Sequence, residues 1–276
     1  MAAPVSFARI TPEDRPPFTV AYDRKGAGEP VVLLHGIGHH LQAWRPVCDI
    51  LAASHEVIAF DLPGFGVSPG LPDGSSYDLS SVIPLLTAAF AGLGIDRPHV
   101  VGNSLGGLLA LELGRTGAVR SVTALSPAGF WTPAERRYAF GLLRGMYAGA
   151  QALPQPTVES LARTALGRAS LTGTFYAHPG RRSADAVVAE TRALRGAAGF
   201  APTLAAGREV RFTSDVPDVP VTIAWGNRDR LLLPRQGIRA KRTIPGARLV
   251  RLPGCGHVPM NDDPALVARV ILDTVS

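Results

Sequence analysis

A serine set between glycines is the clearest chemical feature of this chain. Residues 102–107 read GNSLGG, with Ser104 at the centre of a Gly-x-Ser-x-Gly pattern. The run 98–101 before it and the apolar run 108–111 after it predict a strand, a sharp turn and a helix. Glycines remove side chains that would clash where such a turn crosses itself, and the helix N-terminus favours negative charge at the serine. We interpret Ser104 as a nucleophile rather than part of a plain glycine-rich connection.

A serine hydroxyl needs a base to accept its proton. Of seven histidines, His257 fits best, because it lies in the loop 254–259 (GCGHVP), directly after the strand-like run 248–252. Catalytic groups of a parallel sheet gather beyond the carboxyl ends of its strands. We therefore predict that His257 is the base.

The base needs an acid that fixes its tautomer and stabilises the imidazolium. Asp229 ends the segment 225–229 (WGNRD), which follows another strand-like run, whereas the loop 126–129 contains no carboxylate. A salt bridge with a neighbouring arginine is the structural alternative for Asp229. The order Ser104, Asp229, His257 is the order expected of an α/β hydrolase.

Other carboxylates are expected to serve elsewhere. Asp215 and Asp218 precede their strand and should lie at the wrong end of the sheet. Asp262 and Asp263 follow His257 and are expected to serve the N-terminus of the last helix.

Acyl transfer also requires hydrogen-bond donors for the tetrahedral oxyanion. The backbone N–H of Leu105 is one candidate, because it follows the nucleophile. The second is expected from the loop 35–38 (HGIG), with Ile37 preferred and Gly38 next.

The elements that must position these residues alternate along the chain. Apolar strand-like runs occupy 18–22, 31–34, 56–60, 98–101, 119–125, 219–225 and 248–252. Helix-compatible segments occupy 42–53, 79–93, 105–113, 234–242 and 264–274. Alternation of this kind predicts an α/β fold with a doubly wound, mostly parallel sheet.

The alternation stops between about 130 and 215. Helical patterns at 134–150, 158–169 and 183–194, with several aromatic residues, predict a packed helical cap. The expected division is therefore a first part of the core over 1–129, a cap over 130–215 and a second part of the core over 216–276.

Together these motifs resemble the α/β-hydrolase superfamily, in its cap-bearing branch. The motifs at 35–36, 61–68, 102–107, 225–229 and 254–257 match in order, and the resemblance spans from about Phe18 to the C-terminus. It implies this fold and a Ser-His-Asp triad but leaves the substrate open. Serine at the turn departs from the aspartate of the family's dehalogenases and epoxide hydrolases, which argues against both activities.

The pocket residues are predicted more broadly. His35, Gly36, Gly38, Phe65 and Trp131 are candidates for substrate binding. A metal site is not predicted, because the neighbouring His39 and His40 have no evident further ligands. No cofactor is predicted, because no Gly-x-Gly-x-x-Gly follows the first strands.

Composition restricts the partners. The chain has 276 residues, 46% hydrophobic content and a net charge of +6 that is spread without a block of like charges, so nucleic-acid binding is not expected. Two cysteines, Cys48 and Cys255, form no disulfide framework or zinc pattern. Residues 1–10 lack a secretory leader pattern, and no apolar run is long enough to span a bilayer. A cytoplasmic location and a small-molecule substrate with an apolar portion are expected, with the oligomeric state open.

The expected activity is cofactor-independent hydrolysis of a carboxylic ester through an acyl-enzyme. Three alternatives remain: hydrolysis of a C–C bond in a vinylogous keto acid, perhydrolase or haloperoxidase activity with the same triad, and a ligand-binding receptor that turns over slowly. The C–C reaction would need a cation for the substrate carboxylate, and Arg136, Arg137, Arg144 and Arg192 of the predicted cap are candidates.

Overall fold

One eight-stranded sheet organises the chain, which we describe from a computed structural model covering residues 5–13, 15–72 and 74–276. Residues 1–4 lie outside the described residues. They belong to the segment 1–10, in which no secretory leader pattern is expected. The strand order is β1-β2-β4-β3-β5-β6-β7-β8. Strands β3 to β8 run parallel, whereas β2 pairs antiparallel with β1 and with β4. The strands are β1 (Ser6–Ile10), β2 (Phe18–Lys25), β3 (Pro30–Leu34), β4 (Glu56–Asp61), β5 (His99–Asn103), β6 (Ser121–Leu125), β7 (Val221–Gly226) and β8 (Arg248–Leu252).

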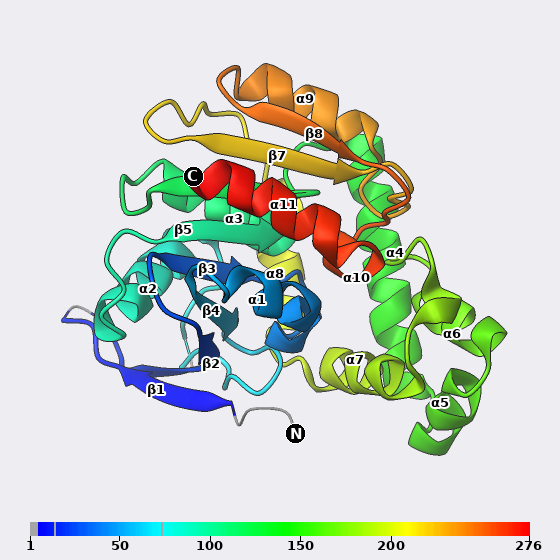
Figure 1. Ribbon diagram of the computed structural model, residues 1–276. Coiled ribbons are helices and arrows are strands. Elements are labelled where there is room, and N and C mark those ends of the chain that lie inside the picture. Colours follow the sequence, from blue (N-terminus) through cyan, green and yellow to red (C-terminus); the bar gives the residue numbers. More distant parts are fainter. Residues whose placement is uncertain (1–4, 14, 73) are drawn as a thin grey trace.

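Helices cover both faces of this sheet, as expected for parallel strands that are apolar on both sides. On one face α1 and α11 pack over one buried cluster; on the other, α2, α3 and α9 pack over a larger cluster (Figure 1). The covering helices are α1 (Arg45–Leu51), α2 (Leu79–Gly92), α3 (Leu105–Gly114), α9 (Arg235–Thr243) and α11 (Pro264–Val275), with the short α10 (Pro259–Asp262) before the last. The predicted fold class is thereby confirmed.

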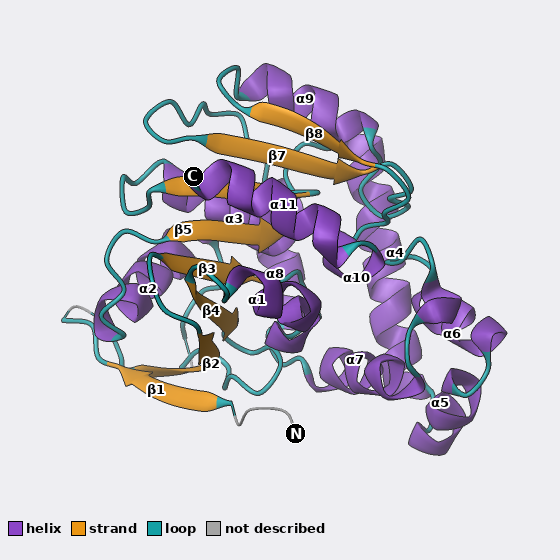
Figure 2. Cartoon of the chain, viewed as in Figure 1, coloured by secondary structure: helices purple, strands orange, loops and turns teal. Residues whose placement is uncertain are grey.

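The segment between β6 and β7 is helical, and Figure 2 shows no strand within it. It contains α4 (Pro133–Ala152), α5 (Gln155–Ala162), α6 (Ala165–Thr172), α7 (Ala184–Gly196) and α8 (Phe200–Ala206). In Figure 1, α4 to α7 lie beyond the carboxyl ends of the strands. We call these five helices the helical insertion.

The first helix of the insertion is fastened to the core at its N-terminus. Thr132 and Glu135 form a reciprocal capping box. The Glu135 carboxylate, only 4% exposed, also accepts hydrogen bonds from Arg235 (2.5 Å) and Arg239 of α9. This ion-pair cluster fixes where α4 starts and therefore how it passes over the strand ends.

The elements that the sequence pattern did not predict include β1, a second helix near the segment 158–169, and α8. Strand β1 is short and largely exposed at the sheet edge, so it has no apolar alternation to reveal it. The single helix expected over 158–169 is two helices, α5 and α6, because Thr164 starts a new helix by accepting a hydrogen bond from the N–H of Gly167. Helix α8 is short and buries Phe200 and Leu204 in the core.

Candidate active site

Ser104 lies at the sharp turn between β5 and α3. Its backbone has φ 56° and ψ −113°, a strained conformation for a residue with a side chain. The two flanking glycines are required by close approach: a Cβ on Gly102 would lie 2.0 Å from the Gly106 carbonyl oxygen, and one on Gly106 would lie 2.1 Å from the Leu34 oxygen. The turn therefore holds the serine at the carboxyl edge of the sheet, before the N-terminus of α3.

The loops after β7 and β8 bring Asp229 and His257 together. The Nδ1 of His257 lies 2.8 Å from Oδ2 of Asp229, and both side chains are buried. The other oxygen of Asp229 accepts the N–H groups of Leu231 and Leu232, each at 2.9 Å. With its proton on Nδ1 beside the carboxylate, the neutral imidazole has its lone pair on Nε2, as a general base requires.

A single amide side chain joins the serine turn to the histidine loop. Asn103, the residue before Ser104, donates from Nδ2 to the carbonyl oxygens of His257 (2.9 Å) and Leu125 (3.1 Å). Because β5, β6, β7 and β8 are parallel neighbours, the loops after them share one edge of the sheet. Ser104, Asp229 and His257, far apart in the sequence, therefore gather at that edge.

The turn after β3 closes over the serine. A Cβ on Gly36 would lie 3.1 Å from the Cβ of Ser104, so the two backbones pass very close to each other. Leu105 is the first residue of α3, and its N–H therefore has no acceptor within the helix. Ile37 and Leu105, the two residues predicted to donate to the oxyanion, line the same cavity as Ser104.

This cavity is small and apolar, with a volume of about 60 Å³. Besides Ile37, Ser104 and Leu105, it is lined by apolar side chains of the core and of α4, Thr203 and the turn at Gly207. Trp131, one of the predicted pocket residues, forms part of its wall. We refer to it as the small cavity.

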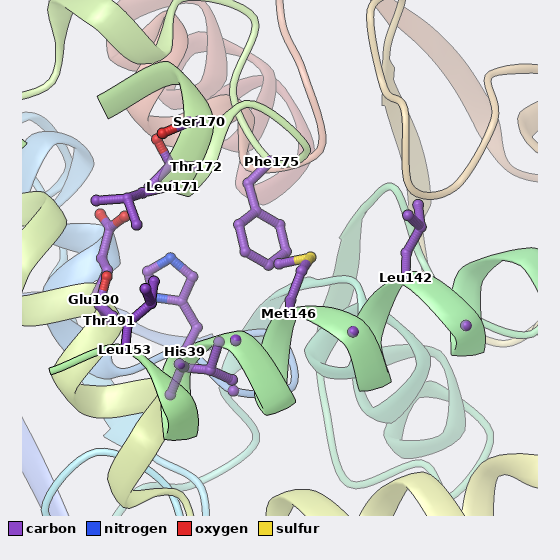
Figure 3. Close-up of a pocket in the computed structure, with 16 residues that line it drawn as sticks. His39, Leu142, Met146, Leu153, Ser170, Leu171, Thr172, Phe175, Glu190 and Thr191 are labelled. Atoms are coloured by element: carbon purple, nitrogen blue, oxygen red, sulfur yellow. The ribbon is translucent and has the colours of Figure 1, made fainter. Parts of the chain in front are cut away.

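A second cavity of about 370 Å³ lies between the core and helices α4, α6 and α7 (Figure 3). Gly38 and His39 line it from the core side, and Phe175 also faces it. In Figure 3 the side chains of Met146 and Phe175 point toward each other. The Phe175 ring lies near parallel to the His257 ring, with centroids 6.4 Å apart, and its carbonyl oxygen accepts the His257 N–H at 2.7 Å. Phe175 therefore contacts both this second cavity, which we call the large cavity, and the histidine.

Three of the predicted pocket residues, His35, Gly36 and Phe65, line neither of these two cavities. His35 is fully buried: Nδ1 donates to the Gly36 oxygen (2.7 Å) and Nε2 accepts the Leu62 N–H (3.0 Å). Burial lowers the pKa of His35 to about 3, so the ring is neutral. Phe65 packs edge-on against His35 and is 2% exposed. His35 therefore supports the turns around the site, whereas Phe65 lines a third cavity of about 30 Å³ that shares Leu105 and Thr203 with the small cavity.

His39 belongs to a buried network that the sequence did not indicate. Its Nδ1 accepts the His40 N–H (3.1 Å), so Nε2 carries the proton and donates to the Tyr176 hydroxyl at 3.2 Å. Burial lowers the pKa of His39 well below its usual value. Arg182 lies over the Tyr176 ring at 4.6 Å and pairs with Glu190. The turn after β3 is thereby connected to the helical insertion.

The expectation that both Asp262 and Asp263 serve the N-terminus of the last helix is wrong for Asp262. Only Asp263 caps the last helix, by accepting the Leu266 N–H at 2.9 Å. The Asp262 carboxylate instead accepts backbone N–H groups of Gly256 (2.8 Å), Ala177 and His178 (each about 3 Å). It therefore links the histidine loop to the segment after α6, a partnership that no sequence signal could reveal because 84 residues separate Asp262 from His178.

Over the described residues, no three His, Cys, Asp or Glu side chains come together as a metal site would require. None of the helices in that part of the chain is long and apolar enough to cross a membrane.

Comparison with known proteins agrees with this architecture. The model of the "Alpha/beta hydrolase family" matches residues 31–270. The chain is 29% identical, over 93% of its length and 90% of the relative's, to a 2-hydroxy-6-oxononadienedioate/2-hydroxy-6-oxononatrienedioate hydrolase of Cupriavidus pinatubonensis.

Two solved structures share the fold at low sequence identity. A thermophilic esterase from Thermogutta terrifontis superposes with a TM-score of 0.78 at 20% identity, covering 98% of each chain. A meta-cleavage product hydrolase from Pseudomonas fluorescens superposes with a TM-score of 0.73 at 20% identity, covering 94% of each chain. The family match over most of the chain, together with this fold, shows that the chain belongs to the alpha/beta hydrolase family.

Proposed function

We propose that this hydrolase cleaves carboxylic esters through an acyl-enzyme, with Ser104 as nucleophile, His257 as base and Asp229 as the group that orients the histidine. The observation that supports this most directly is the 2.8 Å contact between His257 Nδ1 and the buried Asp229 carboxylate, on a loop tied to the Ser104 turn by Asn103. This contact fixes the tautomer that leaves Nε2 able to accept a proton.

In the first half of the reaction, the Oγ of Ser104 attacks the ester carbonyl carbon and its proton passes to Nε2 of His257. The carbonyl oxygen becomes an oxyanion, which the backbone N–H groups of Ile37 and Leu105 stabilise. The N-terminus of α3 adds a favourable field for this negative charge. The tetrahedral intermediate then breaks its C–O bond, and His257 returns the proton to the departing alcohol oxygen.

In the second half, a water molecule attacks the acyl-enzyme while His257 accepts one of its protons. The bond between the acyl carbon and Ser104 breaks, the serine recovers its proton from His257, and the carboxylic acid leaves. No other reactant is needed, so the cycle balances with the ester and one water.

The lining of the two cavities favours a neutral ester over an anionic keto acid. Among the described residues lining either cavity there is no Lys or Arg, and the Glu190 carboxylate that borders the large cavity is paired with Arg182. The arginines considered above lie elsewhere: Arg136, Arg137 and Arg144 border a separate surface hollow, and Arg192 borders a groove between α7 and the core. Among the described residues that line the two cavities, a substrate carboxylate would therefore find no free cation.

C–C bond hydrolysis is the second candidate, because the relative from Cupriavidus pinatubonensis carries that type of name and aligns over nearly the whole chain. We further propose that residues 130–215 act as a cap that selects a small-molecule substrate.

The test uses an active-site probe and paired substrates. A fluorophosphonate is expected to label wild-type protein on Ser104, as located by peptide mass spectrometry, and to leave folded Ser104→Ala unlabelled. Wild type is expected to hydrolyse short p-nitrophenyl esters faster than a ring-cleavage dienoate, and Ser104→Ala neither. Folded wild-type protein without a label on Ser104 would refute the proposal. A clear preference for the dienoate would replace ester hydrolysis by C–C bond hydrolysis as the proposed activity.

A further inference from the structure

The turn after β3 contributes residues to both cavities. Ile37 lines the small cavity together with Ser104, and the next residue, Gly38, lines the large cavity. Helix α4 contributes to both, with Ala139 and Leu143 in the wall of the small cavity and Met146 in that of the large one. For an ester with its carbonyl carbon at Ser104, these two cavities are the candidate spaces for its two arms.

The direction of proton transfer indicates which cavity receives the alcohol arm of the ester and which receives the acyl arm. The departing alcohol oxygen must face His257, because this residue returns the proton to it. Phe175 packs beside the His257 ring and also lines the large cavity. The oxyanion donors and the serine, in contrast, line the small cavity of about 60 Å³. The alcohol arm is thus directed to the space of about 370 Å³ and the acyl arm to the confined one.

Helix α4 keeps the large cavity wide by means of three glycines. Gly141, Gly145 and Gly149 line it at intervals of four residues, so they form one face of the helix. Glycine inside a helix costs roughly 0.5–1 kcal/mol relative to alanine. Yet a Cβ at each of these positions would meet no atom within 4 Å, so packing does not require glycine there. Larger side chains would protrude into the cavity and fill it.

We propose, building on the ester-hydrolase function above, that the large cavity is the binding site for a bulky, uncharged alcohol group and that the enzyme prefers esters of such alcohols with a short acyl group. The wall opposite the glycines supports this substrate class: Leu171, Leu194 and Phe175 are apolar, and the Glu190 carboxylate is already paired with Arg182. The width given by the glycine face suits a ring or a branched group better than a single extended chain.

Two isomeric esters test the direction of binding. Cyclohexylmethyl acetate places the ring on the alcohol and a methyl group on the acyl carbon, whereas methyl cyclohexylacetate reverses this arrangement. Both release an unactivated primary alcohol, so leaving-group chemistry does not separate them. We expect kcat/KM to be at least about tenfold higher for cyclohexylmethyl acetate, the size of discrimination that a poorly fitting apolar group produces. Equal values, or preference for methyl cyclohexylacetate, would overturn the inference.

A variant of the glycine face tests the cavity itself. Gly145→Leu is expected to lower the ratio of kcat/KM for cyclohexylmethyl acetate over ethyl acetate by about tenfold, and Gly145→Ala by about threefold. The alanine variant favours the helix and gives the same readout if leucine disturbs folding. Ala148→Leu is the matched control, because Ala148 is exposed on the same helix and lines neither cavity; its ratio should equal that of wild type. An unchanged ratio in both Gly145 variants would overturn the inference.

The outcomes separate this inference from the proposed function. Failure of fluorophosphonate to label Ser104, with no ester hydrolysed, removes both. Labelling of Ser104 without the expected preference between the isomers removes only the assignment of the large cavity to the alcohol.

Discussion

Replacing Asp229 by asparagine is the sharpest perturbation of the proposed site, because the structure fixes how the new amide must lie. Oδ1 of Asp229 accepts the N–H groups of Leu231 and Leu232, so the amide oxygen of Asp229→Asn has to take that place. Its NH₂ group then faces His257 Nδ1, which lies 2.8 Å from Oδ2 in the native protein. Two donors cannot share that contact, so Nδ1 must become the acceptor and the proton must move to Nε2.

The histidine would then present an N–H toward Ser104 and could not accept the serine proton. In serine hydrolases with a Ser-His-Asp triad, a wrong histidine tautomer lowers kcat by about 10⁴-fold, which corresponds to roughly 5 kcal/mol of transition-state stabilisation. KM is expected to change little, because Asp229 lines neither cavity. Steady-state hydrolysis of a short p-nitrophenyl ester measures both values.

Asp263→Asn is the matched control for that experiment. Asp263 follows His257 closely in the sequence, but its side chain caps α11. Asparagine is an equally good N-cap. Its kcat should equal that of wild type. Folded Asp229→Asn protein with a kcat within tenfold of wild type would refute the role that we assign to Asp229.

Three further predictions concern the surroundings of the site. For His35→Asn, the difference in free energy of unfolding from wild type, measured in urea, should shrink by about 2.5 kcal/mol between pH 7.5 and about 4.5. The pKa of His35 is about 3 in the folded protein and 6.5 in the unfolded chain, so only the unfolded chain takes up a proton and wild type loses stability as pH falls. A difference that stays constant with pH would contradict this. Asp262→Asn should lower the rate of fluorophosphonate labelling by roughly tenfold or more while circular dichroism shows an intact fold. The new amide nitrogen is a donor and cannot accept the backbone N–H groups through which the native carboxylate holds the histidine loop. An unchanged labelling rate would limit Asp262 to a structural role. Glu135→Ala should lower the free energy of unfolding by about 2 kcal/mol, because α4 loses its cap and its ion pairs to α9; an unchanged melting temperature would contradict it.

Local sequence was sufficient where local sterics set the structure. The Ser104 turn could be predicted because only glycine fits at Gly102 and Gly106, and that requirement leaves a short, readable pattern. The parallel strands could be predicted because burial on both faces demands continuous apolar runs. The contact of Asp229 with His257 was predictable only through topology, since parallel strands deliver their following loops to one edge.

Tertiary structure decided what depends on partners distant in the chain. It separated Arg136, Arg137, Arg144 and Arg192 from the two cavities, made His35 a support for the turns, and gave Asp262 its three backbone partners. Gly141, Gly145 and Gly149 lie within the helix predicted over 134–150, but only the structure shows that they form one wall of a cavity. A side chain's type limits the bonds it can form, but the packing of helices against the sheet determines which groups are within reach.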